Sequence, residues 1–228
     1  MQIESDSAFL MTFAHDLRQP LRSILMSAQR LQRGAGELSV EMRAKLDDIS
    51  AAARRQEDLI ASVVEYDQAL SSSAADSPLM VRLAIQTACL KVDAFRQAQE
   101  GVIQFDALQA PRALVPSELA RVLEKGLHNS LKFHRSNSSP RVMVQASETA
   151  AGLVAVRVLD EGLGIDAEYR EAVFEPFKRL NSNSDFPGSG LGLSICRRLV
   201  DAMKGTIRFE DNASGRGGVS LVVTLPRL

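Results

Sequence analysis

Two glycine-rich runs near the C-terminal end of the chain have the composition of a nucleotide-binding site. Residues 160–165 (DEGLGI) follow an apolar, strand-like stretch, and residues 188–193 (GSGLGL) lead into an apolar, helix-like one. Glycines let a ligand approach the backbone closely, and the amides at the start of a helix suit phosphates. Either run alone can be a turn, but their order and contexts favour a nucleotide site.

Asp160 ends the strand-like stretch, and its carboxylate can accept a hydrogen bond from the exocyclic amine of adenine. Guanine has a carbonyl in that place, so Asp160 predicts ATP rather than GTP as the ligand. Gly162 and Gly164 free the backbone beside it. In the second run, backbone amides are brought to the start of the Leu193 helix by Gly188, Gly190 and Gly192.

Two further segments can complete such a site. Asn129 and Lys132 are three residues apart and so share one face of a predicted helix. Asn129 can offer an amide oxygen to Mg²⁺ and Lys132 a point charge to phosphate, although a solvated helix face is the alternative. Phe174 and Phe177 precede a polar, glycine-containing segment, 181–188, which is either a mobile lid anchored by the two phenylalanines or a surface loop with two core aromatics.

His15 can accept a phosphoryl group. It follows Phe13 and Ala14 and lies off the apolar seam of a predicted helix, where both a nucleotide domain and a partner can reach it. Asp16 can orient its ring or take a proton. Pro20 removes a backbone amide and predicts a kink close to the histidine.

The elements that must position these residues begin with a helical hairpin. Apolar residues recur every seven positions in the first helix, at Ile3, Leu10, Leu17, Ile24 and Leu31. Residues 34–36 (GAG) interrupt it, and a second seam over 46–70 follows a helix start near Ser39. Two helices cannot enclose both seams, so we expect a homodimer in which two hairpins form a four-helix bundle.

Residues 71–78 (SSSAADSP) are typical of a linker, which gives predicted domains over 1–73 and 78–228. Helices and strands in the second domain mix without a regular parallel alternation, and an α+β sandwich with helices on one sheet face is favoured. The predicted helices cover 81–97, 116–133 and 191–203. The predicted strands cover 101–106, 141–146, 153–159, 206–210 and 219–225.

The composition sets wider limits. The chain is 228 residues long, 45% hydrophobic and 24% charged, which is typical of a globular protein. Its formal charge of −1 gives no electrostatic indication of nucleic acid or anionic lipid as a partner. Cys89 and Cys196 are isolated and predict buried apolar roles in a reducing compartment. With no apolar window of about 20 residues and no signal peptide, we expect a soluble, cytoplasmic protein.

Five segments resemble, in order, the motifs of two-component sensor histidine kinases. Residues 15–21 (HDLRQPL) are similar to the H box, 127–133 (LHNSLKF) to the N box, 160–165 to the G1 box, 174–177 (FEPF) to the F box and 188–193 to the G2 box. The resemblance covers nearly the whole chain. It implies a dimerisation and histidine-phosphotransfer hairpin followed by a Bergerat-type (GHKL) ATP-binding domain, with some likeness to phytochrome-associated kinases.

The resemblance implies that His15, aided by Asp16, attacks the γ-phosphoryl of ATP, with Mg²⁺ held by Asn129. The phosphoryl group then passes to an aspartate in the receiver domain of a response regulator. No sensor domain precedes the hairpin and no receiver follows, so we expect an excised core or a kinase that takes its input from a partner. The implied ATP-binding residues are Asn129, Lys132, Phe133, Asp160, Gly162, Gly164, Ile165, Phe174, Phe177, Arg179, Gly188, Ser189, Gly190, Leu191, Gly192 and Leu193.

Two positions depart from the family pattern. Lys125 stands where the N box usually has an Asn, and it either touches phosphate or points to solvent. Related chaperone, gyrase and mismatch-repair ATPases have a water-activating glutamate at that turn, and Glu124 is one residue out of phase with it. Gln19 replaces the usual Thr or Asn and predicts weak phosphatase activity. An active kinase, an ATP-hydrolysing machine and a scaffold without chemistry are the three hypotheses.

Overall fold

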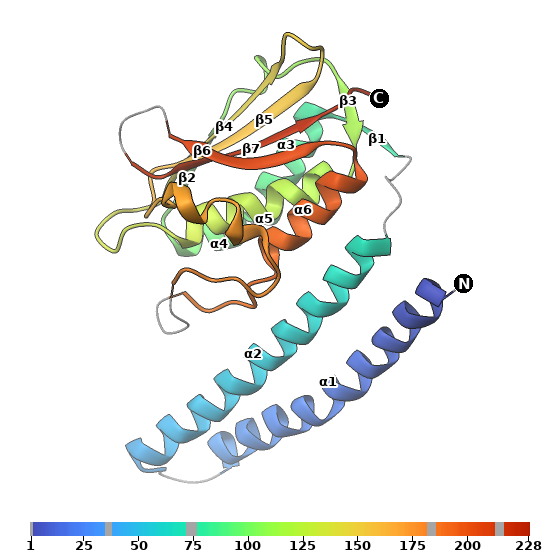
Figure 1. Cartoon of the computed structure of the whole chain (residues 1–228). Helices are drawn as coiled ribbons and strands as arrows, with labels where there is room; N and C mark the ends of the chain where they lie inside the picture. Colours follow the sequence, from blue (N-terminus) through green and yellow to red (C-terminus); the bar gives the residue numbers. More distant parts are fainter. Residues whose placement is uncertain (1, 35–37, 72–76, 182–185, 213–216) are drawn as a thin grey trace. The chain divides into compact units, whose positions relative to one another are not determined.

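The structure of the protein is a computed structural model that describes residues 2–34, 38–71, 77–181, 186–212 and 217–228. The chain divides into two compact units, Met1–Ser71 with Asn181–Ser189 and Ser72–Leu180 with Gly190–Leu228, and each is described by itself (Figure 1). Among the described residues, no helix combines the length and the apolar content that crossing a membrane requires.

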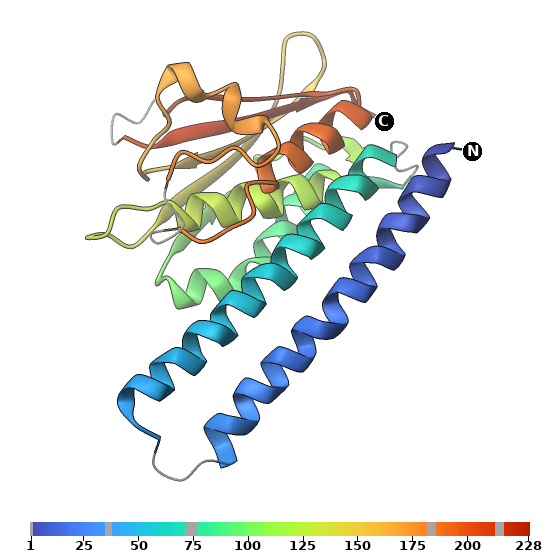
Figure 2. The same cartoon turned by 60° about the horizontal axis from the view of Figure 1, so that its bottom comes forward.

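The first unit is the predicted helical hairpin. It consists of α1 (Gln2–Gly34) and α2 (Val40–Ser71), which run antiparallel (Figure 2). The Ser39 hydroxyl accepts a hydrogen bond from the Met42 amide at 3.2 Å and so caps the start of α2, as the sequence predicted. Near the connection, the Gln32 amide donates to Asp47 at 2.8 Å. Of the interrupting run, residues 35 and 36 lie outside the described part.

The buried residues on the two helices of the hairpin are mostly alanines. Ala14 and Ala28 on α1 and Leu46 and Ala53 on α2 are buried. Several of the larger seam residues are not enclosed: Leu17 is 39% exposed, Ile24 45% and Leu31 56%. The hairpin by itself therefore leaves much of its apolar seam accessible.

The second unit is the predicted α+β sandwich. Its five-stranded sheet has the order β2 (Val102–Phe105), β4 (Arg141–Glu148), β5 (Val154–Asp160), β7 (Val219–Leu225) and β6 (Thr206–Asp211). Strand β2 runs parallel to β4, and the other neighbours are antiparallel. One face of the sheet is covered by α3 (Val81–Lys91), α5 (Leu119–Lys132) and α6 (Gly192–Ala202), as Figures 1 and 2 show.

The core lies between the sheet and α5 and α6. Leu127 on α5, Ile195 on α6 and Leu221 on β7 are all buried. A Cβ on Gly126 would lie 2.8 Å from the Leu221 side chain, so α5 passes close above the sheet. This packing places the last turn of α5 beside the end of β5.

Three details differ from the sequence prediction. The helix predicted over 81–97 ends at Lys91, and α4 (Asp93–Ala98) follows, because Val92 leaves the helical conformation at φ −94° and ψ 1°. Two short strands, β1 (Pro78–Met80) and β3 (Leu114–Pro116), pair antiparallel and were not predicted. Cys196 is buried as expected, whereas Cys89 is partly exposed. None of these differences alters the elements that carry the motifs.

Candidate functional site

Asp160 is the last residue of β5 and only 8% exposed. Its Oδ1 accepts hydrogen bonds from the amides of Gly162 at 3.0 Å and Val219 at 3.3 Å, and its Oδ2 accepts one from the Ser130 hydroxyl at 3.1 Å. Burial raises the pKa of this carboxyl, while the three hydrogen bonds lower it and so favour the charged form. The site is therefore a fixed hydrogen-bond acceptor at the end of the strand.

A close backbone approach frames the other side of Asp160. Gly218 has φ +78°, and a Cβ there would lie 2.0 Å from the Asp160 carbonyl oxygen. The same carbonyl accepts a hydrogen bond from the Asn212 side-chain amide at 2.6 Å. Only glycine fits at position 218, so the segment before β7 is built against Asp160.

The G1 turn is joined to the end of α5. A Cβ on Gly162 would lie 2.5 Å from the Phe133 carbonyl oxygen, and the Leu163 amide donates to that oxygen at 3.0 Å. Gly164 follows with φ +82°. The Ile165 carbonyl accepts a hydrogen bond from Arg170 Nε at 3.1 Å. The structure thus brings the predicted N-box and G1 residues together.

Lys132 is the last residue of α5. Lys132 is half-buried, and burial is the main cause that lowers its pKa, with the charge of Arg179 second. Its ammonium lies 4.9 Å from the centre of the Phe133 ring. A partly desolvated cation is suited to an anion. The phosphate-binding role of Lys132 stays a prediction.

Three further residues on α5 lie in or near the N box: His128, Lys125 and Asn129. The His128 ring stacks on Phe95 of α4 with centroids 4.2 Å apart. Burial lowers the pKa of His128, and the charges of Lys132 and Lys125 lower it further. Lys125 is half-buried, as is Asn129. No cluster of three His, Cys, Asp or Glu side chains that could hold a metal ion exists within the described ranges.

The two F-box phenylalanines have different environments. Phe174 is buried. Its ring centre lies 5.4 Å from the ring centre of Phe209 and 4.3 Å from the guanidinium carbon of Arg197. Phe177 is 60% exposed and has φ +63°, which is rare for a non-glycine residue. Phe174 is thus a core aromatic, and Phe177 is not packed in the core. Residues 182–185 of the predicted lid lie outside the described part.

The G2 run ends where α6 begins. Gly190 has φ +73°, and a Cβ there would lie 2.9 Å from the backbone of Phe177. The buried Leu191 caps the helix with its carbonyl, which accepts from the Ile195 amide at 2.9 Å. Helix α6 then starts at Gly192 and continues through the half-buried Leu193. Earlier in the run, Gly188 is exposed and Ser189 half-buried.

His15 belongs to the other unit and has a purely local environment. Its side chain is 76% exposed, and its Nδ1 lies 3.3 Å from Oδ1 of the neighbouring Asp16. Gln19, one turn further along α1, is also exposed, and its carbonyl accepts a hydrogen bond from the Ser23 hydroxyl at 3.3 Å. Helix α1 continues through Pro20. The kink and the phosphatase role of Gln19 stay predictions.

Sequence reasoning missed three residues of the Asp160 corner: Ser130, Asn212 and Gly218. Ser130 follows Asn129 but faces the sheet. It lies outside the helix face that Asn129 and Lys132 were predicted to share, so the sequence prediction did not include it. The paired glycines 217 and 218 directly before a predicted strand were the available signal for a close approach. Nothing in the local sequence indicates Asn212, whose partner is 52 residues away.

Comparison with known proteins covers both units. The family model "Histidine kinase-, DNA gyrase B-, and HSP90-like ATPase" matches residues 114–228, and "His Kinase A (phospho-acceptor) domain" matches residues 5–71. The adaptive-response sensory kinase SasA of Synechococcus sp. (strain JA-2-3B'a(2-13)) is 30% identical over 99% of this chain and 60% of its own length. Cyanobacterial phytochrome A of Nostoc sp. (strain PCC 7120) is 27% identical over 98% of this chain and 29% of its own length.

Among solved structures, full-length ShkA in complex with AMPPNP matches 96% of this chain and 46% of its own with a TM-score of 0.69. At 22% sequence identity, this likeness shows the shared fold. The chain thus spans between 29% and 60% of the length of these relatives. It belongs to the histidine kinase-, DNA gyrase B- and HSP90-like ATPase family and, with its phospho-acceptor domain, is the catalytic core of a two-component sensor histidine kinase.

Proposed function

We propose that this chain binds ATP at the Asp160 corner, phosphorylates its own His15 and passes the phosphoryl group to an aspartate in the receiver domain of a response regulator. The observation that carries the proposal is the arrangement at the end of α5. A buried carboxylate has one oxygen with capacity for a further donor, and the half-buried Lys132 ends the same helix that carries Ser130, the hydroxyl donor to that carboxylate.

Adenine recognition is the role proposed for Asp160. Its carboxylate is buried and held by three donors; burial raises its pKa, and the three hydrogen bonds oppose that effect. An ionised carboxylate is an acceptor only, so it matches the exocyclic amine of adenine and repels the carbonyl of guanine. Gly162 lets the G1 turn pack against the Phe133 carbonyl, and Gly164 supplies the positive φ with which the turn continues beside the carboxylate.

Phosphate recognition is the role proposed for Lys132, Arg179 and the start of α6. The two side chains supply charge, and the first backbone amides of α6, which begins at Gly192, have no acceptor within the helix. Asn129 provides an amide oxygen, a ligand type that suits Mg²⁺ when phosphate oxygens and water complete its coordination. Bound Mg²⁺ would neutralise negative charge on the phosphates. No carboxylate cluster is needed for that arrangement.

His15 has the features of a phosphoryl acceptor. Its ring is exposed, and a hydrogen bond from Nδ1 to Asp16 leaves the lone pair on Nε2. Nε2 would form a bond to the γ-phosphorus as the bond from that phosphorus to the bridging oxygen breaks, releasing ADP. The Asp16 carboxylate stabilises the positive charge that develops on the ring.

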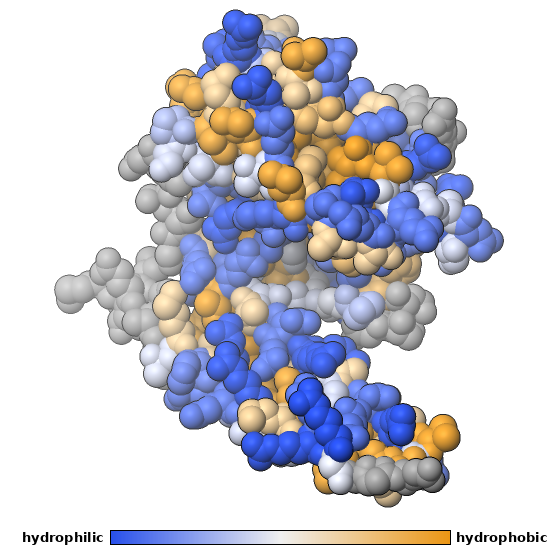
Figure 3. Space-filling view, turned by 180° about the vertical axis from the view of Figure 1, so that it is seen from behind, coloured by the Kyte–Doolittle hydropathy of each residue, from blue (hydrophilic) through white to orange (hydrophobic). Residues whose placement is uncertain are grey.

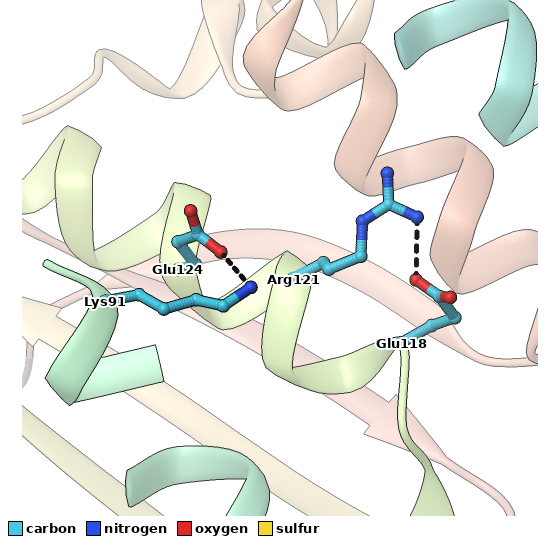
Figure 4. Close-up of polar contacts among 4 residues, drawn as sticks. All are labelled: Lys91, Glu118, Arg121 and Glu124. Atoms are coloured by element: carbon cyan, nitrogen blue, oxygen red, sulfur yellow. Dashed lines mark hydrogen bonds and ion pairs between the residues drawn. The ribbon is translucent and has the colours of Figure 1, made fainter. Parts of the chain in front are cut away.

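The structure argues against the water-activating role of Glu124. Glu124 forms an ion pair with Lys91 of α3 at 3.0 Å, on the part of α5 shown in Figure 4 together with the Arg121–Glu118 pair. Five positions separate Glu124 from Asn129, which puts the two about 140° apart around the helix. Glu124 therefore faces α3, away from the proposed metal ligand.

A second copy of the chain is the partner proposed for the hairpin. A groove between α1 and α2 is lined by Ser23, Ile24, Ser27, Ala28, Leu31, Leu46 and Ile49. Leu31 is 56% exposed, and hydrophobic surface near the connection between the helices is visible in Figure 3. Two hairpins in a four-helix bundle would cover these residues. We place the reaction in the cytoplasm, where ATP and receiver domains are available, with input from a sensor domain or partner.

Leu17→Asp tests the dimer. A carboxylate on the seam would be desolvated without a partner, so we expect a monomer by sedimentation. Met26→Asp is the matched control, because Met26 is similarly exposed on α1 and nine positions from Leu17, about 180° around the helix. A Leu17→Asp dimer, or equal disruption by Met26→Asp, would place the interface elsewhere.

The kinase proposal is tested by incubating the chain with γ-labelled ATP and Mg²⁺. We expect an acid-labile, base-stable label on the protein that is lost in His15→Ala and retained in Glu124→Gln. Addition of a cognate receiver domain should then move the label to that domain. Turnover of ATP without labelled protein would indicate the ATP-hydrolysing machine, and nucleotide binding without either product would indicate the scaffold.

A further inference from the structure

The two oxygens of the Asp160 carboxylate have different partners. Oδ1 accepts two backbone amides, from Gly162 and Val219. Oδ2 accepts one hydrogen bond, from the Ser130 hydroxyl at 3.1 Å, among the described residues. A carboxylate oxygen can accept two donors, so Oδ1 is fully used and Oδ2 has capacity for one ligand N–H.

Ser130 controls the oxygen that is left for the ligand. It is 7% exposed and lies on α5 directly after Asn129, thirty residues before Asp160 in the chain. Its donor is directed at Oδ2, and a second donor at that oxygen must then come from a different direction. The rotation of the carboxylate is thereby restricted from both ends, by backbone at Oδ1 and by Ser130 at Oδ2.

The hydrogen bond also affects the charge of the carboxyl. Burial raises the pKa of Asp160, and the bonds from Gly162, Val219 and Ser130 oppose that effect. A protonated carboxyl would be a donor at the position that faces the base. It would then match a carbonyl, as in a 6-oxopurine, and mismatch the amine of adenine.

We propose that Ser130 is a positioning residue that orients Oδ2 of Asp160 toward the base and sets the pH range over which the chain prefers adenine to a 6-oxopurine. The inference rests on the proposed ATP site. The backbone amides at Oδ1 cannot be removed by side-chain substitution, so Ser130 is the side chain through which the acceptor can be altered.

The charged groups around this corner belong to several elements. They are Lys132 at the end of α5, Arg135 beside Gly217, Arg141 on β4 and Glu161 in the G1 turn. Among the described residues, none of these four side chains donates a hydrogen bond to the Asp160 carboxylate. Ser130→Ala leaves all four in place, and a difference between variant and parent therefore reports on Asp160 rather than on these groups.

The test is calorimetric binding of ATP and of ITP, whose base carries a carbonyl in place of the amine. Parent and Ser130→Ala are compared between about pH 5 and about pH 8, so that protonation of the nucleotide cancels in their ratio. We expect Ser130→Ala to bind ATP about tenfold more weakly at the acid end, with a smaller loss toward pH ~8 and a smaller loss for ITP throughout. Ser130→Thr, which keeps the hydroxyl, should restore the parental profile.

Ser220→Ala is the matched control. Ser220 is buried like Ser130, at 2% against 7% exposed, follows Val219 on β7, and its hydroxyl has no hydrogen-bond partner within the described residues. It should bind both nucleotides as the parent does at every pH. If Ser130→Ala does not fold, Ser130→Cys replaces the hydroxyl with a weak donor of similar size and should shift the profile in the same direction.

A loss that is uniform in pH and equal for ATP and ITP would overturn the inference and leave Ser130 a structural residue. Parental binding by Ser130→Ala at all pH values would overturn it as well. If the parent binds no ATP, the proposed function itself is wrong. The two failures are therefore distinguishable.

Discussion

The Asp160 corner and the His15 region are built in opposite ways. Asp160 is 8% exposed and takes its partners from α5, the G1 turn, the segment after β6 and the start of β7. His15 is 76% exposed, and the side-chain partner in its hydrogen bond is the next residue in the chain. The first site depends on the whole α/β unit, and the second on a single helix.

This contrast separates two physical requirements. A group that must discriminate one base from another needs a fixed direction and a defined charge, which several distant elements provide together. A group that must be reached by macromolecular partners needs exposure, which a helix surface provides without other elements. Substitutions in the two regions should therefore affect stability and chemistry in different proportions.

Gly218→Ala should produce the largest effect. The added Cβ would overlap the Asp160 carbonyl at a positive φ, so we expect a loss of about 3 kcal/mol or more in the free energy of unfolding, together with loss of ATP binding. Gly152→Ala is the control, because Gly152 has φ +74° but no atom within 4 Å of its Cβ position. Denaturant unfolding of both variants measures the difference. Equal losses would mean that strain alone, and not the packed corner, accounts for the effect.

Asp160→Asn should weaken ATP binding with the fold intact. The variant replaces an acceptor-only group with one that also donates, and we expect a loss of about 1 to 3 kcal/mol in binding free energy. Calorimetry with ATP measures it. Unchanged affinity would show that Asp160 does not recognise ATP, and the contrast between the Asp160 corner and the His15 region would then not hold.

The same variant should change how stability depends on pH. Burial raises the pKa of Asp160 in the folded state above about 3.9, its ordinary value. The folded parent therefore holds this proton more tightly than the unfolded chain, and its stability falls as pH rises from about 4 through the folded-state pKa. Asp160→Asn lacks this loss.

We expect Asp160→Asn to gain stability relative to the parent across that interval, and no more above it. Unfolding by denaturant at several pH values gives the difference between the two proteins. A difference that stays constant with pH would show that Asp160 has the same pKa in the folded and unfolded states.

His15→Ala should have the smallest effect on stability. An exposed side chain with one local contact contributes little, and we expect a change within about 0.5 kcal/mol in the free energy of unfolding. The neighbouring Ala14 is buried, so Ala14→Asp should destabilise the hairpin by more than about 2 kcal/mol. Thermal unfolding measures both. A large effect of His15→Ala would mean that the acceptor has a packing role.

Local patterns were sufficient to predict most elements. The strand over 219–225 was predicted at its observed bounds, and the start of α2 near Ser39 followed from its capping residue. The helix over 81–97 was wrong at Val92, because its apolar pattern continues across the break. The break coincides with contacts of the following helix, in which Arg96 donates to the Gly101 carbonyl at 2.9 Å.

The F box illustrates what a pattern could not distinguish. Phe174 and Phe177 are three residues apart and chemically identical, so the sequence left two readings open for both. The structure separates them because Phe209 and Arg197, both distant in sequence, cover Phe174 alone. Phe177 is exposed and has φ +63°. No neighbouring residue type predicts this backbone conformation.

By itself the sequence determined the hairpin, the mixed α/β order and the motif residues, because helix periodicity, strand alternation and glycine spacing are local properties. Only the tertiary structure decided which groups surround Asp160. Ser130 and Val219 lie 30 and 59 residues from it, and Asn212 lies 52 residues away. Hydrogen bonds over such separations depend on how the strands and α5 pack, and packing is a property of the folded chain as a whole.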